Sequence, residues 1–212
     1  MARSAKGPTY ERKFCRMLSH AFTGKEDPCI FWRSAGSGSS ATAMAKRGKA
    51  SHMDGDIVAI DAKGAWLTAA MCIDIKSYAN FNIDSFFRMQ EPDELRRMKN
   101  FLYTLEKYGI KKAIKLEKST PAYWWIKLCY EAQRNKKEPM LVIKRSGYAE
   151  WLIVTNRGVM HDEVRNIGIY PDAYIIVDPN LCNGELEIAI HRFSNFKKAN
   201  LKELKKVITH EY

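Results

Sequence analysis

The sequence predicts a single α/β domain with a central mixed β-sheet flanked by helices. Two observations support this. Segments with apolar residues at helical spacing alternate with short β-like segments, and no change in composition divides the 212 residues into two parts. A chain of this length can bury one sizeable core. Its 46% hydrophobic and 28% charged residues are typical of a globular protein.

The first half of the chain opens with a helix whose apolar residues recur at helical spacing between Pro8 and Gly24. Periodicity predicts four elements here: a helix over 9–22 and strands over 29–33, 56–61 and 69–78. We expect AKG at 62–64 to form a turn that joins the last two strands as an antiparallel pair. This pairing would bring the start of one strand close to the end of the other.

The second half of the chain is predicted in the same way. Its expected elements are helices over 92–109, 121–137 and 200–208, and strands over 139–145, 149–155, 173–178 and 185–193. Pro121 suits the first position of a helix, and Gly109 suits a helix end. The short SGY segment between the first two of these strands predicts a β-hairpin.

Composition narrows the class of partner. The net charge of +11 and the pI near 9.4 favour a polyanion, nucleic acid first. No apolar run approaches the roughly 18–20 residues that span a bilayer, so we expect no membrane association. The first residues lack the apolar segment of a secretory signal, which predicts a cytoplasmic, intracellular protein.

Cysteine and histidine usage argues against zinc. Five cysteines form no C-x-x-C pair and are interpreted as reduced core residues, and the five histidines are scattered.

The segment RSAGSGSSATAMAKRGKASHMDGD, residues 33–56, is small, polar and basic. Its backbone N–H groups and hydroxyls suit phosphate binding, and Lys46, Arg47 and Lys49 add positive charge. We interpret it as a DNA-contacting loop, with a plain solvated linker as the alternative.

Four residues suggest a catalytic site: Glu11, Asp56, Asp74 and Lys76. In IDIK the D-x-K spacing places Asp74 and Lys76 on one face of a strand. Carboxylates bind hard cations such as Mg²⁺, which activate water and polarise a phosphodiester. A nearby lysine can hold the attacking water or neutralise charge growing on phosphorus. Asp54 is an alternative to Asp56, which we favour because it directly enters the apolar strand.

These residues resemble the PD-(D/E)xK nuclease superfamily, and more specifically the archaeal-type Holliday-junction resolvases. The likeness lies in Glu11-Arg12 on a first helix, Arg33-Ser34-Ala35-Gly36-Ser37, a strand aspartate, Asp74-Ile-Lys76, and a helix followed by a Pro139-led strand. It spans residues 7–77 and, more loosely, 121–155. Here a long loop separates Ser37 from Asp56, and Asp74 stands where those resolvases usually carry glutamate.

The resemblance implies a restriction-endonuclease-like core with an insertion at about 78–120 and an extension at about 156–212. Metal ligands would be Glu11, Asp56 and Asp74, binding Mg²⁺ with Mn²⁺ as a substitute, and Lys76 would assist the nucleophile. Ser34 or Ser37, with Arg33, would approach the scissile phosphate. The residues expected to contact DNA are Arg12, Arg33, Ser37, Lys46, Arg47 and Lys49.

The predicted function is therefore metal-dependent cleavage of four-way junctions or other branched DNA. A homodimer would supply the two sites that paired cuts require. Two alternatives remain: a restriction-like or end-processing nuclease on the same scaffold, and a nucleic-acid-binding protein without cleavage.

The basic segments 110–118 and 197–206 are interpreted as facing DNA, with a solvated helix face as the alternative. The insertion contains Phe81, Phe86 and Phe87, which suggest a hydrophobic contact such as one between subunits. One of Trp124 and Trp125 is expected in the core.

Overall fold

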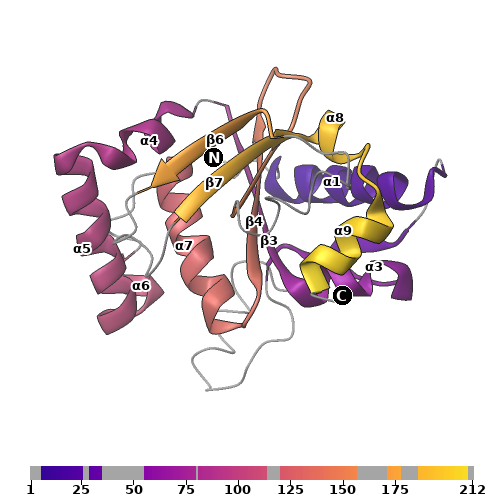
Figure 1. Cartoon of the computed structure of the whole chain (residues 1–212), viewed down its shortest axis with the longest axis horizontal. Helices are drawn as coiled ribbons and strands as arrows, with labels where there is room; N and C mark the ends of the chain where they lie inside the picture. Colours follow the sequence, from indigo (N-terminus) through magenta and orange to yellow (C-terminus); the bar gives the residue numbers. More distant parts are fainter. Residues whose placement is uncertain are drawn as a thin grey trace.

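The computed structural model describes residues 6–25, 29–34, 55–79, 81–113, 120–156, 171–177 and 186–209. A five-stranded sheet has the order β3-β4-β5-β7-β6 and lies between two layers of helices (Figure 1). Its strands are β3 (Met71–Tyr78), β4 (Glu138–Arg145), β5 (Leu152–Asn156), β6 (Ala173–Val177) and β7 (Leu186–Arg192). β3 and β4 are parallel and the other neighbours antiparallel, which confirms the predicted mixed sheet.

The helices cover both faces of this sheet (Figure 1). One side carries α4 (Asp84–Phe87), the 3₁₀ turn η1 (Arg88–Gln90), α5 (Pro92–Tyr108), α6 (Ile110–Ala113) and α7 (Pro121–Arg134). The other side carries α1 (Lys6–Thr23), α3 (Ala62–Ala70), α8 (Phe193–Phe196) and α9 (Leu201–Thr209). Each layer encloses its own apolar cluster against the sheet. Within the described ranges, none of the helices combines the length and the apolar character needed to cross a bilayer.

Helix α7 fills the space between the sheet and α5. Proline at its first turn starts the helix, as the sequence predicts. Trp124 and Trp125 are both buried, at 2% and 0% exposure. The sequence placed one of them in the core and left the other open; both are in the core because α7 is covered by the sheet on one side and by the insertion on another.

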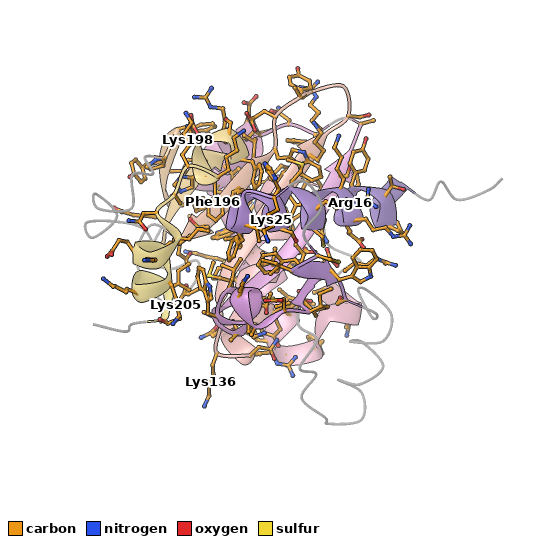
Figure 2. The ribbon with its side chains drawn as sticks, turned by 90° about the vertical axis from the view of Figure 1, so that its right-hand side faces the viewer. Arg16, Lys25, Lys136, Phe196, Lys198 and Lys205 are labelled. Carbon is orange, nitrogen blue, oxygen red and sulfur yellow. The ribbon has the colours of Figure 1, made fainter. Side chains whose placement is uncertain are left out.

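Basic side chains lie along the outer side of the layer formed by α1, α3 and α9 (Figure 2). Phe14 and Leu18 of α1 are fully buried beneath it, which confirms the predicted apolar face. Arg16 and Lys25 lie on the α1 part of this surface, and Lys198 and Lys205 lie near α8 and α9 (Figure 2). Positive side chains from both ends of the sequence thus share one face.

One connection differs from the prediction. Residues 62–64 do not form a turn, because Ala62–Ala70 is the helix α3, and β3 begins only at Met71. The Asp61 side chain accepts a hydrogen bond from the backbone N–H of Lys63 and caps the helix (2.8 Å), and alanine favours helix formation. The strand β2 (Ile57–Ala59) therefore pairs with β1 (Phe31–Arg33) in a separate two-stranded sheet rather than antiparallel to β3.

The insertion and the extension pack against the rest of the chain. Phe86 is fully buried in the same cluster as α7, and Phe81 packs against it, so only Phe87, at 55% exposure, remains on the surface. Beyond residue 156, β6 and β7 continue the main sheet. The described cysteines are all free; Cys15 and Cys72 are buried, whereas Cys29 is exposed, unlike the core position expected for it.

Candidate active site

The site forms where β2 touches β3 through one parallel bridge, between Gly55 and Ile73. The backbone N–H of Asp56 donates to the carbonyl of Ile73 (2.7 Å). Gly55 has φ +89°, and a Cβ atom there would lie 2.5 Å from the Ile73 carbonyl oxygen. Only glycine allows the two backbones to approach this closely. The bridge therefore places Asp56 against the middle of β3.

Two carboxylates and one lysine meet at this point. Asp56 and Asp74 share a side-chain hydrogen bond. The Lys76 ammonium lies 2.7 Å from the Asp74 carboxylate. Asp74 is 9% exposed and Lys76 is half-buried. The expected convergence of Asp56, Asp74 and Lys76 is thus present, although a parallel bridge rather than an antiparallel pair of strands produces it.

Burial and charge set the protonation of the pair. Desolvation, followed by repulsion from Asp74, raises the pKa of Asp56 to about 8. Burial would also raise the pKa of Asp74, but Lys76 reverses that effect and lowers this pKa below its usual value. Burial lowers the pKa of Lys76, and the Asp74 and Asp56 charges raise it more strongly, so the pKa lies above that of an ordinary lysine. These shifts favour an ionised Asp74, a charged Lys76 and a proton on Asp56.

Ser34 stabilises the backbone at the Gly55–Ile73 bridge through two hydrogen bonds. It is fully buried, its Oγ donates to the carbonyl of Gly55 (2.8 Å), and its backbone N–H donates to the carbonyl of Asp56 (2.9 Å). The resemblance implied that Ser34 approaches the scissile phosphate. In the structure the Ser34 hydroxyl donates to the backbone next to Asp56, so Ser34 also helps to position that residue.

Glu11 is held by Arg33. The Arg33 Nε lies 2.9 Å from the Glu11 carboxylate, in an ion pair that joins α1 to β1. Glu11 is 9% exposed, at the rim of the buried face of α1, as predicted. The two residues expected to bind metal and phosphate, respectively, are thus paired with each other.

The structure describes only part of the expected DNA-binding set. Arg12 is exposed on α1, one residue beyond Glu11. Ser37, Lys46, Arg47, Lys49 and the alternative ligand Asp54 lie outside the described residues. The role of the loop between β1 and β2 therefore remains a prediction.

A divalent cation fits this donor set in part. Asp56 and Asp74 are hard oxygen donors whose mutual repulsion a cation would relieve. Across the described ranges, however, no three His, Cys, Asp or Glu side chains are grouped so that they could hold a metal ion. Glu11, the third expected ligand, is paired with Arg33 instead.

Sequence reasoning missed contributions from α7. Lys127 helps to lower the pKa of Asp74, and Glu131 helps to raise the pKa of Lys76. The two residues are four apart and half-buried on a helix that packs against β3 and β4. Their spacing places them on one helix face, but nothing local indicated which face met the site.

The chain was compared with known protein families, curated proteins and solved structures. No protein-family model, curated protein or solved structure gives a significant match to the chain.

Proposed function

We propose that this protein is a divalent-metal-dependent endonuclease that cleaves phosphodiester bonds in branched DNA, with four-way junctions as the first candidate substrate. The observation that carries the proposal is the contact of Asp56 with Asp74 beside Lys76, across two strands joined by a single backbone bridge. Burying Asp56 beside Asp74 costs folding free energy when Asp56 ionises, and a function that uses both carboxylates would account for that cost.

The surrounding fold supports a PD-(D/E)xK scaffold. Glu11 lies on the first helix, Asp74 and Lys76 lie on β3 at one edge of the main sheet, and α7 leads into a strand with Pro139 near its start. These are the elements that the sequence resemblance predicts. Lys127 and Glu131 of α7 add charge at the same point.

Each residue has a proposed role. A bound Mg²⁺ or Mn²⁺ would supply Lewis acidity and lower the pKa of water. Asp56 and Asp74 would hold the cation, with Glu11 joining them. Lys76 acts as a fixed cation that stabilises negative charge growing on phosphorus, and its raised pKa argues against a role as proton acceptor.

The charge of the chain supports a nucleic acid as substrate. The surplus of +11 suits a polyanion, and Arg16, Lys25, Lys198 and Lys205 lie together on the side of α1 and α9 (Figure 2). A four-way junction has near two-fold symmetry, so paired cuts would require two active sites, which a homodimer would supply.

A non-cleaving nucleic-acid-binding protein is the second candidate. The ion pair of Glu11 with Arg33 favours it, because this pairing keeps one expected metal ligand occupied. A restriction-like or end-processing nuclease would share the active site and differ in substrate.

The proposal is tested by incubating the purified protein with Mg²⁺ or Mn²⁺ and an immobile four-way junction, linear duplex, single strand or splayed fork. We expect paired symmetric nicks in the junction and a loss of at least ~10³-fold in rate for Asp74→Asn. Asp93→Asn, on an exposed turn of α5, is the matched control. Cleavage of duplex or of DNA ends instead would support the proposed active site and contradict the four-way junction as the substrate. Binding without any cleavage would favour the second candidate.

A further inference from the structure

An exposed aromatic and cationic surface lies at the ends of β3 and β4. Tyr78, the last residue of β3, is 40% exposed, and Tyr148 in the following hairpin is 57% exposed. Tyr78 is directly opposite Arg145 in the parallel register of the two strands, so their side chains share one face of the sheet. The Arg145 guanidinium lies 4.5 Å from the centre of the Tyr148 ring. We call these three residues the Tyr78 surface.

The Tyr78 ring is held in place by the core. It stacks on Trp124 with ring centres 4.6 Å apart and an angle of 13° between the planes. Trp124 is 2% exposed and also meets Phe81 edge to face, at 6.1 Å. A buried tryptophan thus fixes the orientation of a partly exposed tyrosine, so little rotational freedom would be lost when a ligand binds to it.

Two hydrogen bonds fix the backbone of Tyr148 in the turn after β4. Its N–H donates to the carbonyl of Arg145 (3.3 Å), and its own carbonyl accepts a hydrogen bond from the Lys144 ammonium. Gly147 provides the positive φ, +83°, that this turn requires. The backbone of Tyr148 therefore has a defined position, and its ring lies beside the Arg145 guanidinium.

This surface adjoins the candidate active site. Tyr78 lies two residues beyond Lys76 on the same face of β3, a separation of about 6.6 Å along the strand. A nucleic acid strand that places a phosphate at Lys76 would bring its neighbouring nucleotide to Tyr78.

We propose that the Tyr78 surface stacks against a nucleobase that lacks a stacking neighbour at the branch point of branched DNA, next to the phosphate held at Asp74 and Lys76. The inference rests on the proposed function and extends it to substrate recognition. Aromatic rings stack on any base, and Arg145 adds a cation for the backbone. The bases of an intact duplex already stack on one another, so this surface discriminates in favour of DNA that exposes an unstacked base, as the splayed fork and the open four-way junction both do.

The test is binding without cleavage, measured by fluorescence anisotropy in EDTA with a splayed fork, a four-way junction and a linear duplex. Tyr78→Ala should weaken binding to the fork and the junction about tenfold and change duplex binding less than about twofold. Tyr78→Phe, which keeps the ring, should bind like the wild type. Tyr174→Ala, at a 47% exposed tyrosine of β6 on the opposite edge of the sheet, is the matched control.

Two further measurements keep the result interpretable. Tyr148→Ala leaves the Trp124 stack intact, so a selective loss in this variant supports the surface even if Tyr78→Ala unfolds. A 2-aminopurine base at the fork should lose fluorescence on binding to the wild type and not to Tyr78→Ala. Equal losses on fork and duplex, or no loss in either alanine variant, would overturn the inference.

Cleavage assays run in parallel separate this inference from the proposed function. Asp74-dependent cleavage with no effect of Tyr78 or Tyr148 overturns the stacking surface alone. Tyr78-dependent preference for branched DNA without cleavage overturns the nuclease and leaves the surface in place.

Discussion

The Asp56 carboxylate accepts a hydrogen bond from the backbone N–H of Ile75, at 2.8 Å. This bond lies at the edge of β3 and directs the Asp56 side chain toward the residues on either side of Ile75, which are Asp74 and Lys76. One side chain thus fastens the small β1–β2 sheet to the main sheet and completes the acidic pair. Stability and the proposed chemistry depend on the same contact, and the predictions below separate the two.

Asp56→Asn should remove a pH-dependent cost to stability. The pKa of Asp56 is raised to about 8 in the folded protein, from an ordinary aspartate value of 3.8. Between these values only the folded state keeps the proton, so this contribution to stability is lost as pH rises from about 4 to about 8. Asparagine keeps a hydrogen-bond acceptor for Ile75 and does not ionise.

We therefore expect the stability of Asp56→Asn, relative to wild type in EDTA, to increase steadily over this range. The gain should reach at least about 1 kcal/mol, a rise of about 2–4 °C in Tm. Thermal unfolding followed by circular dichroism at several pH values checks this, with Asp93→Asn as the exposed control. Parallel curves for wild type and Asp56→Asn would show that the pair imposes no such cost.

Ser34→Ala should reduce stability and turnover without weakening DNA binding. The substitution leaves the Gly55 carbonyl without its 2.8 Å side-chain donor, a loss of about 1–3 kcal/mol at a buried site. Urea unfolding measures the stability, and anisotropy in EDTA measures the affinity for DNA. Thr68→Ala, which removes only a 3.4 Å surface contact, is the control. Weaker DNA binding with unchanged stability would instead assign Ser34 to the phosphate contact.

Arg33→Met should increase the affinity for Mn²⁺ in the absence of DNA. If Glu11 joins Asp56 and Asp74 in holding the cation, Arg33 competes with the metal for its carboxylate. Removing this positive charge should strengthen binding about fivefold or more, and Glu11→Gln should weaken it. Isothermal titration with Mn²⁺ measures both.

A second ion pair supplies the control for this experiment. Arg97 lies 3.3 Å from the buried carboxylate of Glu94 on α5, and Arg97→Met should leave Mn²⁺ binding unchanged. An unaltered or lower affinity in Arg33→Met would make the Glu11–Arg33 pair purely structural.

DNA binding should fall steeply with salt. Each phosphate that the protein neutralises contributes about −0.9 to the slope of log K against log salt concentration. Arg12→Gln, exposed on α1 beside Glu11, should reduce the magnitude of the slope by about one. Lys136→Gln, near the start of β4 and far along the strands from Tyr78, should not change it. Equal slopes for the wild type and Arg12→Gln would place α1 outside the DNA contact.

Local periodicity predicted most elements of the fold correctly. The helices α1, α5, α7 and α9 and the β4–β5 hairpin lie where their apolar spacing indicated. Helix α3 was missed because AKGAWLTAA is short and has almost no polar face, so no helical stripe is visible in it. Asp61, immediately before it, was the cap signal that could have revealed it.

The sequence by itself determined the chemistry that the site can offer. The D-x-K spacing of Asp74 and Lys76 sets a common strand face through the geometry of one strand, and Gly55 beside Asp56 permits a close backbone approach. Only the tertiary structure decided which of these residues contact one another. It joins Arg33 to Glu11, Ser34 to Gly55 and Tyr78 to Trp124. Those residues are distant in the chain or on separate elements, and their contacts arise from the packing of whole layers, which no local pattern encodes.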